Sequence, residues 1–282
     1  MKRVLAIHDL SGFGRCSLAV IAPIISAMGV QCCQLPTAFL STHTGGFTGF
    51  TFHDMTDEMP KILEHYKTLE LEFDAIYSGF LGSMRQTEIV ADCISSLRTE
   101  KMLALIDPVM GDHGKPYRTY TPEMLSGMGT LADMADVITP NLTEAAILLG
   151  VPYEKAPDDE AGMREWLTAL SRNGERSVVV TGLSFSEGTV GCGYFERESG
   201  KSGFSFRPYV GDSYPGTGDV FASALLASLL SGIPLPAAVD IAAGFVYDCC
   251  EVTFAAGTPR REGVAFEPLL IRLMTAITGA KV

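Results

Sequence analysis

The chain lacks any cluster of lysine or arginine residues, and this absence excludes one broad class of partner. Its 282 residues contain 21 Lys and Arg against 33 Asp and Glu, which gives a formal net charge of −12. A protein that binds nucleic acid needs a basic face to displace the counterions of the phosphate backbone. We therefore expect no nucleic-acid partner, and we expect any phosphate-bearing ligand to be held by backbone amides or a metal ion.

Long hydrophobic runs are also missing, since no apolar stretch approaches the ~18 residues that a membrane helix requires. The first ten residues, MKRVLAIHDL, begin like a signal peptide. Their apolar run is too short, however, and it continues directly into residues 11–15, so we interpret it as a buried strand. We expect no membrane partner and predict a cytoplasmic location.

Cysteine spacing gives no sign of a disulfide framework or a metal site. The seven cysteines are odd in number and form no CxxC pair. Such residues are typical of small buried side chains in a reducing compartment. The hydrophobic residues, 47% of the chain, are sufficient for a large core.

Two common nucleotide-binding motifs are absent as well. The glycine turn at residues 216–219 ends in Asp219 and not in Gly-Lys-Ser/Thr, so it is not a Walker A loop. No GxGxxG follows the first expected strand with an acidic residue ~20 positions further on, which counts against a Rossmann oxidoreductase.

What the sequence does contain is an alternation of short apolar runs with amphipathic stretches. The expected strands are residues 4–8, 30–35, 75–78, 103–107, 137–139 and 177–181, and the expected helices are residues 17–28, 57–69, 86–97, 122–132, 143–149, 160–172, 220–230 and 236–250. This order predicts an α/β fold with a mostly parallel sheet covered on both faces. Residues 188–195 and 203–207 alternate like an antiparallel pair. No linker or repeat divides the chain, so we predict one domain over residues 1–282.

Several expected strands end in polar or glycine-rich segments. In parallel sheets the ligand lies beyond the carboxyl ends of the strands, so these segments are expected to meet in one crevice. They are His8-Asp9, Ser78-Gly79-Phe80, Asp107-Pro108, Thr139-Pro140-Asn141 and Thr181-Gly182.

The sharpest candidate site is Gly216-Thr217-Gly218-Asp219, which precedes an apolar helix. Glycines allow a tight turn in which successive N–H groups point at one anion, and the helix adds its dipole. If the turn binds a phosphoryl group in this way, Asp219 is a general base beside the group that is transferred. The same four residues are also typical of an ordinary turn with a helix cap.

Two acidic segments follow expected strands. Asn141 and Glu144 lie three residues apart at a helix start, where they can form a capping box or place Glu144 near a metal-bound water. Asp107 and Asp112 flank a turn that suits either a metal or phosphate site or a solvated loop.

Residues 41–49 combine three glycines with four hydroxyl side chains. Such a segment is typical of a mobile lid or pocket wall, and equally of a surface loop. His43 within it has no partner at metal-ligand spacing, so a structural hydrogen bond is its expected role.

Taken in order, these segments resemble the pyridoxal kinase branch of the ribokinase-like superfamily. The matching stretches are Thr42-His43-Thr44-Gly45, Ser78-Gly79-Phe80-Leu81-Gly82-Ser83, Asp107-Pro108-Val109-Met110-Gly111, Thr139-Pro140-Asn141-Leu142-Thr143-Glu144 and Gly216-Thr217-Gly218-Asp219. The resemblance implies a three-layer α/β/α sandwich with a mostly parallel central sheet and a small lid, usually dimeric. It also implies ATP, Mg²⁺ and often K⁺, with ATP and a B6 vitamer as substrates.

The resemblance also implies roles for individual residues. Asp219 corresponds to the general base, and Gly216, Thr217 and Gly218 to the anion hole. The metal and triphosphate side is assigned to Asp107, Glu144, Thr139, Asp112, Asn141 and Thr181, and the substrate side to Asp9, His43, Thr44 and Phe80.

Two of these residues depart from the family pattern. Asp9 stands where the family generally has Ser, and Phe80 where Tyr is usual. A carboxylate favours a ring with a protonated nitrogen or an amine, so we hypothesise that Asp9 shifts preference toward pyridoxamine.

The first alternative is a hydroxymethylpyrimidine kinase, a family that shares the DPVM and GTGD segments. That family typically has Gly-Gly-Ala-Gly after the first strand, where this chain has Ser11-Gly12-Phe13-Gly14. A sugar kinase and a non-catalytic vitamer- or nucleotide-binding protein are further alternatives.

Overall fold

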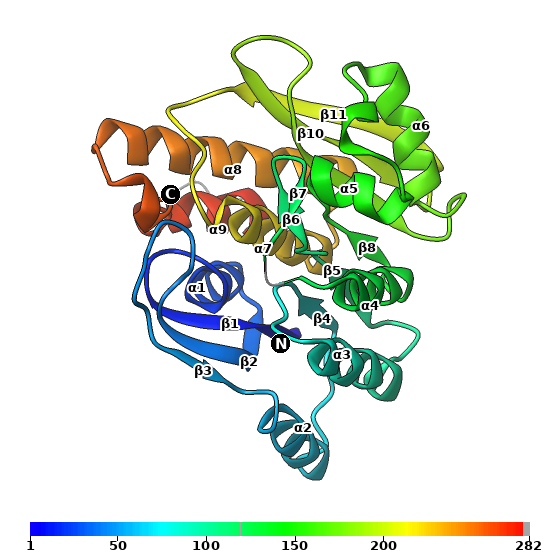
Figure 1. Ribbon diagram of the computed structural model, residues 1–282, viewed down its shortest axis with the longest axis vertical. Helices are drawn as coiled ribbons and strands as arrows, with labels where there is room; N and C mark the ends of the chain where they lie inside the picture. The colour runs from blue at the N-terminus through cyan, green and yellow to red at the C-terminus, as the bar shows by residue number, and fades with distance from the viewer. Residues whose placement is uncertain (119, 279–282) are drawn as a thin grey trace.

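The computed structural model describes residues 1–118 and 120–278. Its centre is a sheet of order β11-β10-β9-β8-β5-β4-β1-β2-β3 (Figure 1). The strands are β1 (Arg3–Phe13), β2 (Gln31–Thr42), β3 (Phe52–Asp54), β4 (Ala75–Ser78), β5 (Leu103–Ile106), β8 (Val137–Ile138), β9 (Ser177–Leu183), β10 (Thr189–Glu196) and β11 (Lys201–Pro208). All pairs from β2 to β9 are parallel, whereas β3, β10 and β11 pair antiparallel at the two edges.

Helices cover both faces of this sheet, as the strand–helix alternation predicts. One face packs against α1 (Leu18–Ala27), α7 (Thr217–Leu230), α8 (Leu235–Ala255) and α9 (Leu270–Thr278). The other packs against α2 (Met59–Thr68), α3 (Met84–Leu97), α4 (Pro122–Asp133), α5 (Leu142–Leu149) and α6 (Glu160–Leu170). The predicted three-layer sandwich with a mostly parallel sheet is thereby confirmed.

Strand β1 shows how one sequence serves two cores. Val4 and Ala6 belong to the cluster under α1 and α7, whereas Leu5 and Ile7 belong to the opposite cluster. Successive side chains of a strand point to opposite faces, so a strand buried on both faces is apolar throughout.

Two strands are longer than the sequence predicts. The strands expected at residues 4–8 and 30–35 extend to Phe13 and Thr42, because Ser11 and Phe13 continue to pair with Leu40 and Thr42. The unpredicted strand β3 then pairs with the end of β2. The three strands form an extension of the sheet edge that carries the loop at residues 43–51 (Figure 1).

The strand order reverses at β1, which lies between β2 and β4. Ligands of open α/β sheets bind beyond the carboxyl ends of the strands at such a point. A small hairpin of β6 (Gly111–Asp112) and β7 (Lys115–Pro116) follows β5 at the same end.

Among the described residues, no helix has both the length and the apolar character needed to cross a membrane.

Candidate active site

The turn at residues 216–219 has the geometry of an anion-binding helix start. Gly216 has φ +79°, and a side chain there would collide with the backbone carbonyl of Arg15. Helix α7 begins at Thr217, whose hydroxyl donates to the Tyr214 carbonyl at 3.1 Å. The first N–H groups of α7 are thus presented at the carboxyl end of the sheet.

Asp219 lies in the first turn of α7 and is partly buried. Its Oδ2 accepts the backbone N–H of Ser17 at 2.8 Å. Burial raises the pKa of Asp219 to about 7, with a further contribution from the charge of Asp9, while the Ser17 hydrogen bond opposes the shift. Asp219 can therefore take up a proton near neutral pH.

Asp107, directly after β5, faces the same turn. Its Oδ2 lies 4.0 Å from the position that a side chain on Gly218 would occupy. Burial raises the pKa of Asp107, as does the charge of Asp219, while the Thr139 hydroxyl lowers it. The structure thus brings together three of the predicted segments, those that contain Asp107, Thr139 and Asp219.

Glu144 and Asn141 form the capping box that the sequence left open. Asn141 Oδ1 accepts the Glu144 N–H at 3.0 Å, and Glu144 Oε2 accepts the Asn141 N–H at 2.8 Å. The second oxygen of Glu144 accepts the Met110 N–H at 3.0 Å, and Asn141 Nδ2 donates to the Gly111 carbonyl at 2.8 Å. Both residues therefore tie the loop after β5 to the start of α5.

The remaining residues of the predicted phosphate side occupy different environments. Thr139 is buried at the end of β8. Thr181 on β9 is half-buried and pairs with Asn141 in an isolated parallel bridge. Asp112 is exposed on the β6–β7 hairpin, where its carboxylate accepts the His113 N–H at 2.8 Å.

On the predicted substrate side, Asp9 is buried and engaged by two hydroxyl groups. Ser17 Oγ donates to Asp9 Oδ1 at 2.6 Å, and Ser11 Oγ donates to Oδ2 at 3.2 Å. Phe80 is half-buried, and its ring lies edge-on to Tyr120 with the ring centroids 6.2 Å apart.

His43 is buried and uses both ring nitrogens within the protein. Nδ1 accepts the Gly45 N–H at 3.1 Å, so the proton is on Nε2, which donates to the Arg261 carbonyl at 2.8 Å. The hydrogen bonds give His43 the structural role expected from the sequence, and they fix the loop against residues 260–262. Thr44, the next residue, is exposed.

The sequence did not predict two features of the site, the contacts of Ser17 and a hollow beside the 216–219 turn. Ser17, expected as the first residue of a helix, instead joins Asp9 to Asp219. A serine directly before an apolar helix is a signal for an N-cap, but nothing in the sequence shows which distant carboxylates it meets.

Arg260 and Arg261 also line a hollow together with Gly45, Gly46, Pro215 and Pro259, next to the 216–219 turn.

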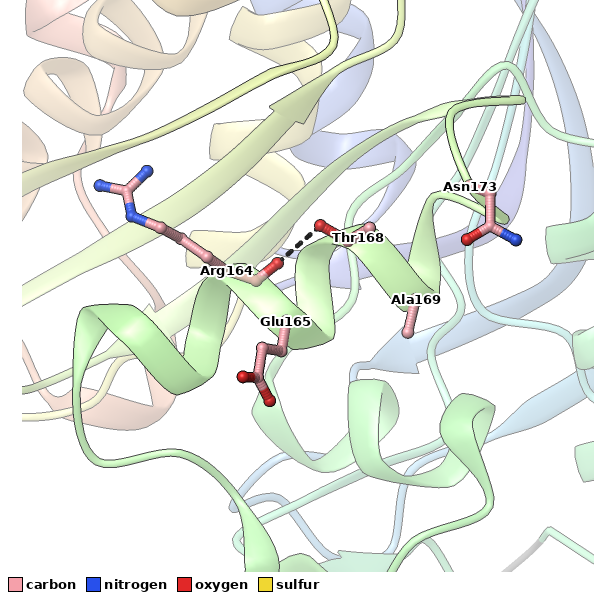
Figure 2. Close-up of a pocket in the computed structure, with 5 residues that line it drawn as sticks. All are labelled: Arg164, Glu165, Thr168, Ala169 and Asn173. Carbon is pink, nitrogen blue, oxygen red and sulfur yellow. Dashed lines mark hydrogen bonds between the residues drawn. The ribbon is translucent and has the colours of Figure 1, made fainter.

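Another hollow lies on the outer face of α6, lined by Arg164, Glu165, Thr168, Ala169 and Asn173 (Figure 2). Thr168 donates to the Arg164 carbonyl at 2.9 Å within the helix. None of the residues predicted for the site lines it, so it is separate from the carboxylate cluster.

The acidic side chains of the site offer few ligands for a divalent cation. In residues 1–118 and 120–278, no group of three or more His, Cys, Asp or Glu side chains converges to hold a metal by itself. Mg²⁺ in phosphoryl-transfer sites is usually bound through one or two carboxylates, with phosphates and water completing its shell. The buried Asp107 carboxylate beside the α7 turn fits that arrangement, whereas both oxygens of Glu144 already accept backbone N–H groups.

The known proteins that this chain resembles are kinases of small ring compounds. The model of the phosphomethylpyrimidine kinase family matches residues 23–262. Two curated relatives are a hydroxymethylpyrimidine/phosphomethylpyrimidine kinase of Mycobacterium tuberculosis (28% identity; 90% of each chain) and a pyridoxal kinase of Granulibacter bethesdensis (27% identity; 90% of this chain and 91% of the relative).

Three solved structures share the fold. A protein of Bacteroides thetaiotaomicron, provisionally named a phosphomethylpyrimidine kinase, is 44% identical over 96% of this chain and 95% of its own in a crystal form with pyridoxal, with a TM-score of 0.91. Pyridoxal kinase of Lactobacillus plantarum is 30% identical (98% and 97% covered; TM-score 0.89). Pyridoxal kinase of Leishmania donovani with ADP and pyridoxamine is 25% identical (97% and 96% covered; TM-score 0.87).

Proposed function

The chain belongs to the phosphomethylpyrimidine kinase family, and from this premise we propose that it transfers the γ-phosphate of ATP to the 5′-hydroxymethyl group of a B6 vitamer. That it is a phosphotransferase acting on a hydroxyl group follows from the family and from its pyridoxal kinase relatives. Pyridoxal in the Bacteroides protein, and ADP with pyridoxamine in the Leishmania enzyme, support the choice of vitamer and nucleotide.

The observation that carries the proposal is the position of Asp219 at the start of α7. In the proposed reaction its carboxylate takes the proton of the vitamer hydroxyl as that oxygen attacks the γ-phosphorus. A base of this kind contributes roughly 10²–10⁴-fold to the rate. The N–H groups of Gly216, Thr217, Gly218 and Asp219 stabilise the charge on the transferring group.

Asp107 is the residue we propose to contact Mg²⁺, since its buried carboxylate faces the same turn. The cation neutralises phosphate charge in reactions of this class. Thr139 contributes a hydroxyl beside Asp107, and Glu144 acts by holding the Met110 backbone in place.

The nucleotide side is proposed to include Asn141, Thr181 and Asp112. Asn141 and Thr181 bridge the ends of β8 and β9, while Asp112 lies on the exposed hairpin after β5. The vitamer side is proposed to include Thr44 and Phe80, with His43 holding the loop that carries Thr44.

A hydroxymethylpyrimidine kinase is the second candidate, favoured by the family description and by the mycobacterial relative. The two functions use the same chemistry on a different ring. Only the relative efficiency for each acceptor separates them.

The test is an ADP-release assay with ATP, Mg²⁺ and one acceptor at a time: pyridoxal, pyridoxine, pyridoxamine or hydroxymethylpyrimidine. We expect the highest kcat/KM for a B6 vitamer. Asp219→Asn should lose about 10²–10⁴ in kcat while ADP still binds. Turnover of hydroxymethylpyrimidine alone would select the second candidate, and no turnover of any acceptor would contradict both.

A homodimer and stimulation by K⁺, both drawn from the family resemblance, complete the proposal together with the cytoplasmic location expected from the sequence. Sedimentation equilibrium tests the dimer. The same assay in NaCl and in KCl tests the cation requirement.

A further inference from the structure

Ser17 makes one hydrogen bond to each of two carboxylates that come from different parts of the chain. Its backbone N–H donates to Asp219 Oδ2 at 2.8 Å, and its hydroxyl donates to Asp9 Oδ1 at 2.6 Å. Asp219 belongs to α7 and Asp9 to β1, so a single residue connects the sheet to the helix that carries the proposed base.

The backbone of Ser17 is strained in order to do this. Its φ is +53° and its ψ is −137°, a region that residues with a side chain rarely adopt. Strain of this kind persists where the surrounding structure enforces it, and it is concentrated at functional sites.

Ser17 also gives up the usual role of its position. It is the N-cap residue of α1, where a serine side chain normally accepts an N–H of the first turn. No such hydrogen bond is formed, because the hydroxyl is directed to Asp9.

Asp9 is held in turn on both of its oxygens. Ser11 Oγ donates to Oδ2 at 3.2 Å, and the side chain is 6% exposed. Asp9 lies where the pairing register of β1 with β2 shifts between His8 and Leu10. A bulge at this point redirects a side chain out of the regular alternation.

We propose that Asp9 and Ser17 are positioning residues for Asp219: Asp9 fixes the Ser17 hydroxyl, and Ser17 in turn holds Asp219 Oδ2 through its backbone N–H. This inference rests on the proposed function. Among the described residues, none donates to Asp219 Oδ1. The arrangement therefore leaves Oδ1 to meet the acceptor hydroxyl. In this arrangement Asp9 assists the reaction equally with every acceptor. This role replaces the hypothesis that Asp9 shifts preference toward pyridoxamine.

The experiment compares Ser17→Gly and Asp9→Asn with wild type, each alone and in an Asp219→Asn background. Glycine keeps the N–H and adopts φ +53° without strain, so Ser17→Gly removes the hydroxymethyl side chain and its bond to Asp9 but keeps the N–H that holds Asp219. Ser171→Ala is the matched control, since this buried hydroxyl donates to the Thr168 carbonyl at 2.7 Å away from the site. Steady-state kcat and KM are measured for ATP and each vitamer.

We expect each single variant to lower kcat about 10- to 100-fold, because Ser17→Gly removes the hydrogen bond to the charged Asp9 and Asp9→Asn removes the charge that strengthens it. KM for ATP and the order of preference among vitamers should change less than twofold. The Ser17→Gly/Asp9→Asn double variant should be no slower than the slower single variant, and neither change should matter once Asp219 is Asn.

Three results would overturn the inference while leaving the proposed function intact. They are wild-type kcat in both single variants, an equal loss in the Asp219→Asn background, or a change of vitamer preference in Asp9→Asn at unchanged kcat. A wild-type protein that phosphorylates none of the vitamers would overturn the inference together with the proposed function.

Discussion

The Glu144 carboxylate accepts the Met110 backbone N–H at 3.0 Å, which joins α5 to the loop that follows Asp107. Its other oxygen accepts the Asn141 N–H at 2.8 Å. We predict that Glu144→Ala lowers the free energy of unfolding by about 1–3 kcal/mol, because buried N–H groups lose their acceptor. Urea denaturation measures this loss. We also expect a lower kcat, since the loop beside Asp107 is released.

Asp159→Ala is the control for Glu144→Ala. Asp159 also caps a helix, accepting the Gly162 N–H at 2.8 Å at the start of α6, but it is exposed. Its loss should cost about 1 kcal/mol without changing kcat. Equal kcat in both variants would contradict the proposed role of Glu144 in holding the active-site loop.

The sequence predicted β4 at its exact bounds, since a short buried apolar run with polar ends needs no information from elsewhere. It also predicted the antiparallel edge formed by β10 and β11. It missed β3 and the extension of β1 to Phe13, because those residues are held in strands by their partners and not by their own pattern. It missed α9 as well.

The candidate site divides in the same way. Residues that a local sequence pattern identifies, such as Gly216 and Asp219 before an apolar helix, were predicted as candidates from the sequence. The contacts of His43 with Arg261 and of Ser17 with Asp219 join residues about 200 positions apart. No local pattern encodes such pairs, so they became visible only in the fold.

The pH dependence of turnover should follow the ionisation of Asp219. Burial raises its pKa to about 7, and the proposed base acts in its deprotonated form. We therefore predict that kcat/KM for pyridoxine rises with pH and levels off above about 7. The residual rate of Asp219→Asn should lack this limb; an unchanged profile in that variant would assign the ionisation to another group.

Asp219 should also cost the protein stability at high pH. Its pKa in the folded state lies above the ordinary value of 3.8, so the folded state binds the proton more tightly than the unfolded state, and stability falls as pH rises from about 4 to 7. Asn keeps an acceptor for the Ser17 N–H and has no charge to bury. We predict that Asp219→Asn is more stable than wild type by about 1–3 kcal/mol at pH 8, with a smaller difference at pH 5. Urea denaturation at both values tests the sign.

His43 should act on substrate affinity through the loop that it holds. His43→Phe keeps a ring of similar size but removes the hydrogen bonds to Gly45 and Arg261. We predict that KM for the vitamer rises about 10-fold with a small change in kcat, because a freed loop must be ordered again on binding. His53→Phe, at an exposed histidine on β3, is the control. If KM for the vitamer is unchanged in both variants, the loop does not contribute to vitamer binding.

Gly216 and Gly232 flank α7 and have nearly the same backbone conformation, with φ +79° and +82°. A side chain at Gly216 meets the Arg15 carbonyl, whereas nothing lies within 4 Å of one at Gly232. Gly232→Ala therefore pays only for the left-handed backbone, about 1 kcal/mol. Gly216→Ala must in addition displace α7 or residues 15–16, next to the Ser17 N–H that holds Asp219. We predict that Gly216→Ala loses both stability and kcat, while Gly232→Ala loses stability alone, as measured by urea denaturation and the ADP-release assay. Equal kcat in the two variants would show that the close approach of Gly216 to Arg15 is not needed to place the base.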